Sequence, residues 1–328
     1  MYGYHTFHEK IMGKLIENVR GGFNSHAYIF EGRDGADLKN SAMLFAAALT
    51  CLNIKSAPCG ACRSCVESKA GTNPDIMHIV REIEDGKQKK TLGIEPIRKA
   101  VKDAQIRPFN APLKVYIIED GHLMTEDAQN AFLKTLEEPP EYAVFIILAP
   151  NCETLLQTIL SRAVLIHFPP VSDSVTEKYI RGKYPDEEYR LNFLVKYCGG
   201  IPSEADKIIG NEAFEALRAG ALEMLPLLLS KNTEDAFKIQ KFFTDNKEDT
   251  DMLLDFWISY LRDIVIILRG MPDKIINTDK SEELRRISVN TQPHLCVKAV
   301  DEIIKTKDML KRSVKHSAAI MHCALSLK

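Results

Sequence analysis

Four of the chain's eight cysteines lie within fifteen residues and could together bind one metal ion. They are Cys51, Cys59, Cys62 and Cys65, with the spacing C-x7-C-x2-C-x2-C. A C-x2-C pair folds two thiolates around one ion, and tetrahedral zinc takes four such ligands. Four protein ligands leave no open position, so the spacing predicts a structural zinc ion and not a catalytic one. A reduced, metal-free cluster and an iron–sulfur cluster are the alternatives.

The segment "GRDGADLKNS" (32–41) has the place of a phosphate-binding loop, because it lies between an expected strand and an expected helix. Counted from Gly32, the motif G-x-x-x-x-G-K-[ST] puts Asp37, Leu38 and Lys39 where glycine, lysine and Ser or Thr are required. Gly35 is the other glycine of the loop. A carboxylate at position 37 adds bulk and repels an anion where backbone N–H groups should approach phosphates. The segment therefore predicts the shape of a nucleotide site without its chemistry, and no productive binding of ATP.

Two further motifs are ambiguous when taken by themselves. Glu119 and Asp120 end the apolar run "VYIIED" and resemble the acids that help to hold Mg²⁺ in nucleotide sites. The usual order is Asp then Glu, and beside a defective phosphate loop a structural role is favoured. Ser161 and Arg162 precede another short apolar run, and a lone arginine in a loop is usually a solvated surface residue.

These residues need a scaffold, and the apolar runs of the first half of the chain predict a parallel sheet. Short apolar runs, typical of strands, alternate with helical patterns, which is the order of an α/β module with both sheet faces covered. The expected strands are 26–32, 74–80, 114–120, 143–150 and 163–168, and the expected helices between them are 38–51, 93–109 and 125–140. After "PPVS" (169–172) only helical periodicity follows, first over 173–210 and then over 211–328.

One helix of the second half, at 252–268, is apolar around most of its surface. Its polar residues, Asp255, Ser259, Arg262 and Asp263, fall on one narrow stripe. The rest of the helix must be covered, either by its own domain or by another subunit.

The length, composition and net charge of the chain exclude some classes of protein. A length of 328 residues predicts two or three domains, and 45% apolar residues suffice for a full core. A net charge of −2 argues against a free-standing nucleic-acid binder driven by bulk positive charge. The N-terminus "MYGYHTFHEK" has no signal-peptide pattern, and no run of 18 apolar residues predicts a membrane span. We therefore expect a cytoplasmic protein with reduced thiols.

The motifs in their order resemble one known family. "HAYIFEG", the cysteine insert, "KVYIIEDGHLMTEDAQNAFLKTLEEPP" and "LLQTILSR" resemble the delta-prime family of bacterial DNA polymerase III clamp-loader subunits, within the AAA+ clamp loaders. The most specific stretch is "NAFLKTLEEPP", where Phe132 replaces a leucine of the family. The family's arginine-finger motif S-R-C matches Ser161 and Arg162, with Ala163 in place of the cysteine. The specific motifs cover residues 1–210, and the later helices match by type and length only.

The resemblance implies an organisation for the whole chain. It implies an AAA+ domain over 1–170 with a zinc-binding insert at 51–65, a helical lid over 171–211 and a helical collar over 212–328. It also implies partners: delta and gamma/tau subunits in a ring of five, the sliding clamp, and primed DNA reached through the assembly. In this family the corresponding helices face the DNA channel, so the resemblance makes Arg98 and Lys99 of the 93–109 helix candidate phosphate contacts. The alternative is that both are solvated surface residues.

The function implied is that of a non-catalytic subunit of the DNA polymerase III holoenzyme. Such a subunit helps to load the sliding clamp, has no ATPase activity in isolation, and supplies Arg162 in trans to a neighbouring ATPase. Two alternatives stay open: an ATP-hydrolysing motor subunit of the same family, and a zinc-ribbon nucleic-acid-binding protein. The first requires an intact G-K-[ST], and the second a strongly basic surface.

Overall fold

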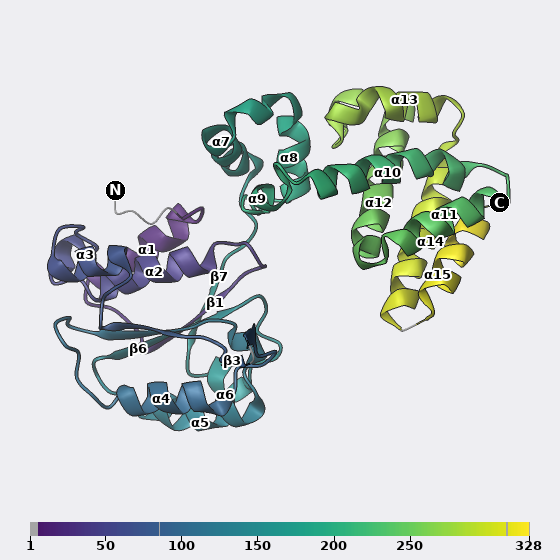
Figure 1. Ribbon diagram of the computed structural model, residues 1–328. Helices are drawn as coiled ribbons and strands as arrows, with labels where there is room; N and C mark the ends of the chain where they lie inside the picture. The colour runs from purple at the N-terminus through teal and green to yellow at the C-terminus, as the bar shows by residue number, and fades with distance from the viewer. Residues whose placement is uncertain (1–5, 85, 313, 328) are drawn as a thin grey trace. The chain divides into compact units, whose positions relative to one another are not determined.

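The computed structural model describes residues 6–84, 86–312 and 314–327, so the first residues of the N-terminal stretch considered above, 1–5, lie outside the described residues. The chain forms two compact units, Met1–Val175 with Gly200–Ser203, and Thr176–Gly199 with Glu204–Lys328. The first unit is an α/β module and the second is helical (Figure 1). The predicted fold class is thereby confirmed.

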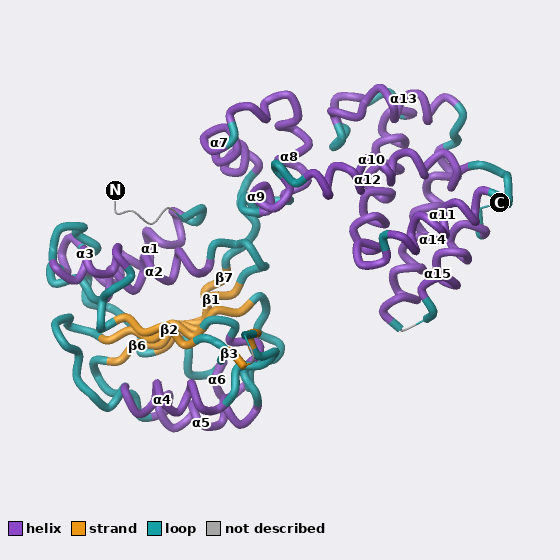
Figure 2. Tube along the Cα trace, viewed as in Figure 1, coloured by secondary structure: helices purple, strands orange, loops and turns teal. Residues whose placement is uncertain are grey.

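The first unit is built on a parallel sheet in the order β2-β5-β6-β1-β7. All five predicted strands are confirmed, and Figure 2 shows them in orange between two layers of helices. The central strands are buried on both faces, as their unbroken apolar runs predict. The strands are β1 (Ala27–Glu31), β2 (Ile76–Ile79), β5 (Lys114–Ile118), β6 (Ala143–Ala149) and β7 (Val164–His167), and a separate hairpin is formed by β3 (Ile83–Glu84) and β4 (Lys87–Gln88).

Helices cover both faces of this sheet, and each face has its own core (Figure 1). Successive residues of a strand point to opposite faces, so Val115 and Ile117 join one core while Tyr116 and Ile118 join the other. One face carries α1 (Glu9–Arg20), α2 (Leu38–Leu49) and α3 (Arg63–Ala70), the other carries α4 (Ile94–Asp103), α5 (Glu126–Glu137) and α6 (Gln157–Leu160), and the 3₁₀ turns are η1 (Ile54–Ser56) and η2 (Gly121–Leu123).

The observed helices differ from the predicted ones mainly at their ends. The helix expected over 93–109 ends at Asp103, and Pro108 lies in the loop that follows. The residue before a proline is pushed toward extended backbone, which opposes a helix through that point. The helix expected over 125–140 ends at Glu137, immediately before Glu138 and its two prolines. Helices α1 and α3 were not predicted.

The second unit consists of helices and connecting loops, as predicted after residue 172. Its division into a lid, 171–211, and a collar, 212–328, stays a prediction, and both spans contribute to one compact unit. None of the described helices is long and apolar enough to cross a membrane. The elements are α7 (Asp173–Lys183), η3 (Pro185–Arg190), α8 (Leu191–Cys198), α9 (Glu204–Ile208), α10 (Glu212–Leu229), α11 (Asp235–Asp245), η4 (Lys247–Asp249), α12 (Thr250–Leu268), η5 (Pro272–Lys274), η6 (Thr278–Lys280), α13 (Ser281–Val289), α14 (Pro293–Lys311) and α15 (His316–Leu325).

Helix α12 is the central helix of this unit and packs against α10, α13 and α14. Its Trp257 Nε1 donates a hydrogen bond to the Ala221 carbonyl at 2.8 Å, so a large apolar side chain is buried without losing its polar bond. Asp263, expected on the polar stripe, is fully buried and accepts hydrogen bonds from the backbone of Ile276 and Asn277. Most of the apolar surface of α12 is therefore covered by its own unit, while Leu268 at the end of the helix is exposed.

Candidate functional site

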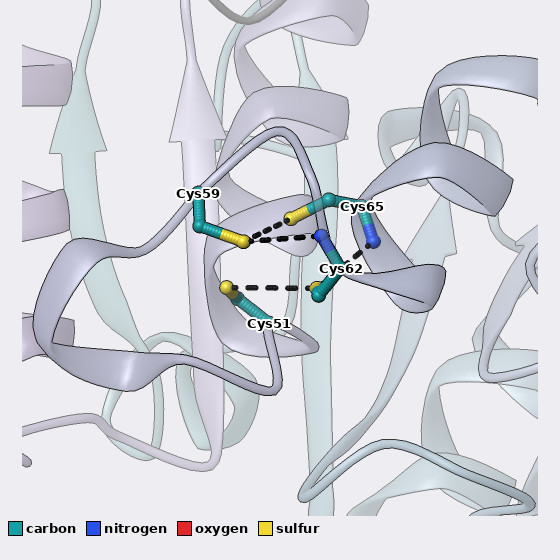
Figure 3. Close-up of side chains that lie close together, drawn as sticks. All are labelled: Cys51, Cys59, Cys62 and Cys65. Carbon is teal, nitrogen blue, oxygen red and sulfur yellow. Dashed lines mark hydrogen bonds between the residues drawn. The ribbon is translucent and has the colours of Figure 1, made fainter.

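The four clustered cysteines are brought together at the end of α2 and the start of α3 (Figure 3). Their sulfur atoms all lie within 4.8 Å of one another, with 4.0 Å between Cys51 and Cys62 and 3.9 Å between Cys59 and Cys65. Four sulfurs bound to zinc at about 2.3 Å would be separated by about 3.8 Å. The described residues thus form a donor set that fits a tetrahedral metal ion.

Two backbone N–H groups of the insert point toward sulfur atoms of the cysteine cluster. The N–H groups of Cys62 and Cys65 donate to the sulfurs of Cys59 and Cys62, at 3.3 and 3.4 Å. Hydrogen bonds from the Ala61 and Cys62 backbone lower the pKa of the Cys59 thiol to about 6, whereas burial raises the pKa of Cys51 and Cys65. A bound divalent cation reverses the cost of burial, because it stabilises the thiolates directly.

The cysteine cluster is joined to the core of the first unit. Cys51 and Cys65 are buried in the core that α1 and α2 form against the sheet. Arg20 of α1 donates from Nε to the Ala57 carbonyl at 2.8 Å. The buried Asn73 donates to the hydroxyls of Ser64 and Ser68. A metal ion at this position would fasten the loop between α2 and α3 to the module.

The predicted phosphate loop lies between β1 and α2 and borders a hollow of about 330 Å³. Asp37 precedes the first residue of α2 with φ at 62°, in the left-handed region that favours glycine. Asn40 Nδ2 donates to its carboxylate at 2.6 Å, and burial raises the pKa of Asp37 to about 6. The backbone thus has the turn that a phosphate loop uses, while an acid occupies the place of the required glycine.

The hollow also contains the two acids at the end of β5, and each is bound to a cation. Lys39 Nζ lies 2.9 Å and His78 Nδ1 2.8 Å from the Glu119 carboxylate. Arg81 Nε donates to Asp120 at 2.8 Å. Hydrogen bonds from His78 and Lys39 lower the pKa of Glu119.

The sequence analysis did not identify His78 and Arg81 as site residues, although their position along the chain indicates this role. Both lie at or just after the end of β2, which pairs in parallel with β5, the strand that Glu119 follows. The carboxyl ends of parallel strands meet at one edge of a sheet. A basic residue at the end of one such strand is therefore placed close to an acid at the end of the next.

Arg162 lies after α6 and is held to its own module on two sides. Its Nη2 donates to Glu137 Oε1 at 2.8 Å, and its Nη1 donates to the Thr158 carbonyl at 2.9 Å and to Ser161 Oγ at 3.2 Å. About one third of the Arg162 side chain is exposed. The sequence predicted Ser161 and Arg162 as candidates but gave no role to Glu137, the last residue of α5.

The candidate DNA contacts lie elsewhere in the first unit. Arg98 and Lys99 are both exposed on α4, and Arg98 Nη1 pairs with Glu95 at 3.0 Å. Helix α4 packs in the core of the sheet face opposite to the one that carries α1, α2 and the cysteine cluster. Arg98 and Lys99 contribute to neither the cysteine cluster nor the hollow beside the phosphate loop.

Comparison with known protein families identifies the family to which this chain belongs. A family model described as DNA polymerase III, delta subunit, matches residues 7–172, and a model of the C-terminal part of that subunit matches residues 214–321. The chain belongs to the DNA polymerase III delta-subunit family. The resemblance stated from the motifs is thereby confirmed.

Individual proteins similar to this chain include several subunits of DNA polymerase III. Subunit delta prime of DNA polymerase III from Bacillus subtilis is 26% identical, over 97% of this chain and 95% of that protein. Subunit tau/gamma from Haemophilus influenzae is 31% identical, but the match covers 58% of this chain and 28% of the relative. Among solved structures, a DNA polymerase III gamma-subunit-related protein from Thermotoga maritima is 21% identical, covers 90% of this chain and 97% of its own, and has a TM-score of 0.40.

The delta-subunit match includes the sheet and its helices as well as the cysteine insert. This extent favours a polymerase subunit over a free-standing zinc-ribbon protein.

Proposed function

We propose that the chain is the delta-prime subunit of a bacterial clamp loader, and that it supplies Arg162 to the nucleotide site of a neighbouring ATPase subunit. In this proposal the chain itself does not turn over ATP. Its partners are delta and gamma/tau subunits, and the assembly places a sliding clamp on primed DNA. The nearly full-length similarity to a delta-prime subunit supports the choice of subunit.

The observation that carries the proposal is the contrast between two sites of one module. At the phosphate loop, Asp37 stands where the backbone should approach a phosphate, and Lys39 is bound to Glu119. At the other site, Arg162 is held in place yet remains partly exposed. A module arranged in this way is suited to donate a cation to another nucleotide and poorly suited to bind its own.

The chemistry of the finger follows from charge. Negative charge develops on the phosphoryl group and the leaving group during transfer, and a pre-positioned guanidinium stabilises it. The planar fork of arginine can engage two oxygens, which the point charge of lysine does not reproduce. The donor needs no ATP of its own, because it contributes only a fixed cation. A rigid parallel sheet with a metal-fastened insert would provide the support.

The cysteine cluster has a structural role in this proposal. The four cysteines would hold one zinc ion with no position open for substrate or water, and the ion would stabilise the link between α2 and α3. Such a zinc ion supplies no step of ATP hydrolysis or clamp loading.

The test is the variant Arg162→Ala in the loader reconstituted with its partner subunits, clamp and primed DNA. We expect the steady-state ATPase rate and clamp loading to fall by more than about tenfold, since fingers supplied in trans contribute about 10³–10⁵ in other phosphoryl-transfer systems. Arg181→Ala is the matched control, because Arg181 is an exposed arginine that pairs with Glu177 on α7. Normal rates in a correctly assembled Arg162→Ala complex would contradict the proposal.

A further inference from the structure

Glu137 and Arg162 connect two segments of the first unit that are 25 positions apart in the sequence. Glu137 is the last residue of α5, and Glu138 and two prolines follow it directly. Proline cannot continue a helix, so the end of α5, and with it the place of the Glu137 backbone, is fixed by the chain itself. Arg162 follows the short helix α6, and its guanidinium meets the Glu137 carboxylate at 2.8 Å.

An acidic residue at position 137, the end of α5, is electrostatically unfavourable for this helix. The C-terminus of an α-helix has a partial negative charge, which disfavours an acid in the last turn and favours a cation. Lys134 lies in the last turn of α5, and Arg162 adds a second cation that contacts the Glu137 carboxylate directly from outside the helix. The acid at position 137 is therefore explained by its partner and not by the stability of α5 alone.

The contacts of Arg162 fix its orientation while leaving part of it available. Glu137 binds Nη2, and the Thr158 carbonyl and Ser161 Oγ bind Nη1. Ser161 Oγ also donates to the Thr158 carbonyl at 3.1 Å, so the two acceptors of Arg162 Nη1 are hydrogen-bonded to each other. A guanidinium has five N–H donors. Among the described residues, the Nε–H of Arg162 has no hydrogen-bond partner, and the side chain is about one third exposed.

We propose that Glu137 is a positioning residue for Arg162, which rests on the function proposed for Arg162 above. The carboxylate holds the guanidinium from one side while the end of α6 holds it from the other. The donors left unused can then engage an anionic phosphate oxygen of a neighbouring subunit without first breaking these contacts. Without Glu137, the Arg162 side chain would sample several rotamers. Fixing it in one rotamer would then cost conformational entropy in each catalytic cycle.

The experiment compares variants at positions 137, 138 and 162 in the reconstituted loader with clamp and primed DNA. We expect Glu137→Ala to lower kcat for ATP by roughly two- to fivefold, the range expected from an exposed ion pair, with KM for ATP unchanged. Glu137→Gln should recover most of the rate, because an amide oxygen can still accept from Nη2. Glu138→Ala is the matched control, since Glu138 is exposed beside Glu137 and does not contact Arg162.

A double variant separates positioning from a general structural effect. In the Arg162→Ala background, Glu137→Ala should have no further effect on kcat. An additive loss, or a failure of Glu137→Gln to restore the rate, would overturn the inference. So would a Glu137→Ala rate at or above that of the wild type.

The two proposals can fail separately. If Arg162→Ala has no effect, the function proposed for Arg162 fails and the role of Glu137 fails with it. If Arg162→Ala impairs the loader but Glu137→Ala does not, only the positioning role is wrong.

Discussion

Lys39 and Glu119 form an ion pair, with 2.9 Å between the ammonium nitrogen and the carboxylate. The lysine lies in the phosphate-loop segment, at the second residue of α2, and the acid directly follows β5. The pair thus joins the two parts of the fold that hold phosphate and Mg²⁺ in related nucleotide sites. His78 contacts the same carboxylate. A nucleotide with its metal ion would have to break these contacts and would also meet the carboxylate of Asp37.

The first prediction is that the isolated chain does not hydrolyse ATP. Asp37 and Leu38 replace the residues that approach and neutralise the phosphates, and Lys39 is already paired. The measurement is steady-state phosphate release by the purified chain, with and without DNA. Turnover that persists in a contaminant-free preparation and disappears in Glu119→Gln or Asp120→Asn would contradict this prediction.

The second prediction concerns the stability cost of Asp37. Burial raises the pKa of this carboxyl to about 6 in the folded chain, above its ordinary value of 3.8. The folded state therefore binds the proton more tightly, so this group costs no stability at low pH. The cost appears as the pH rises above about 4 and reaches its full size above about 6.

Asp37→Asn should therefore stabilise the first unit at pH 7.5, and the gain should shrink as the pH is lowered toward 4. The difference in pKa sets an upper limit of about 3 kcal/mol on the gain in free energy of unfolding. We expect a gain of about 1–2 kcal/mol, because the Asp37 side chain keeps some contact with solvent. Urea unfolding at both pH values measures the gain. Asp34→Asn, an exposed acid of the same loop, is the control. Equal stabilities of wild type and Asp37→Asn at pH 7.5 would contradict the prediction.

The third prediction is one zinc ion per chain, bound by Cys51, Cys59, Cys62 and Cys65. Cys62→Ser should weaken zinc retention by more than about 100-fold, since changes to groups that only orient metal ligands already cost about 10–100-fold. The insert should lose stability while the parallel sheet remains folded. Cys296→Ser, at a buried cysteine of the second unit, should leave the zinc content unchanged. Elemental analysis of the purified chain is the measurement, and a zinc-free protein would end the hypothesis.

Local sequence patterns were sufficient to predict most of the scaffold. The buried strands β5 and β6 are continuous apolar runs, and such runs indicate strands without any knowledge of the rest of the chain. The cysteine cluster was predictable for a similar reason, because spacings of two residues already hold ligands close together. The phosphate loop could be located because it is a contiguous segment between a strand and a helix.

The missed residues act through partners that are distant in the sequence. His78 and Glu119 are 41 positions apart, Arg81 and Asp120 are 39, and Glu137 and Arg162 are 25. No local period or spacing encodes such pairs, because they depend on which strands and helices become neighbours in the fold. Asp263 illustrates the same limit. It lies on the polar stripe of α12, yet a loop that follows the helix covers it and binds its carboxylate.

The fourth prediction concerns Arg98 and Lys99, which are exposed on α4. Exposed cations are usually solvated, and Glu95 partly neutralises Arg98 at 3.0 Å. Contact with DNA phosphates would release counterions, so binding would depend on salt. We expect the double variant Arg98→Ala with Lys99→Ala to weaken DNA binding by the assembled loader and to lower its DNA-stimulated ATPase rate. The slope of log affinity against log salt should become shallower by about one for each lost contact.

The matched control removes the same charge from the opposite face of the sheet. Lys10→Ala with Lys14→Ala changes two exposed lysines on α1, which packs in the other core. A general effect of net charge would weaken DNA binding equally in both double variants, whereas a local contact would weaken it only in the α4 variant. Fluorescence anisotropy of a labelled primed template, titrated with the loader between low and physiological salt, gives affinity and slope together. If the α4 variant keeps both the affinity and the salt slope of the wild type, Arg98 and Lys99 are solvated surface residues and α4 does not contact DNA through them.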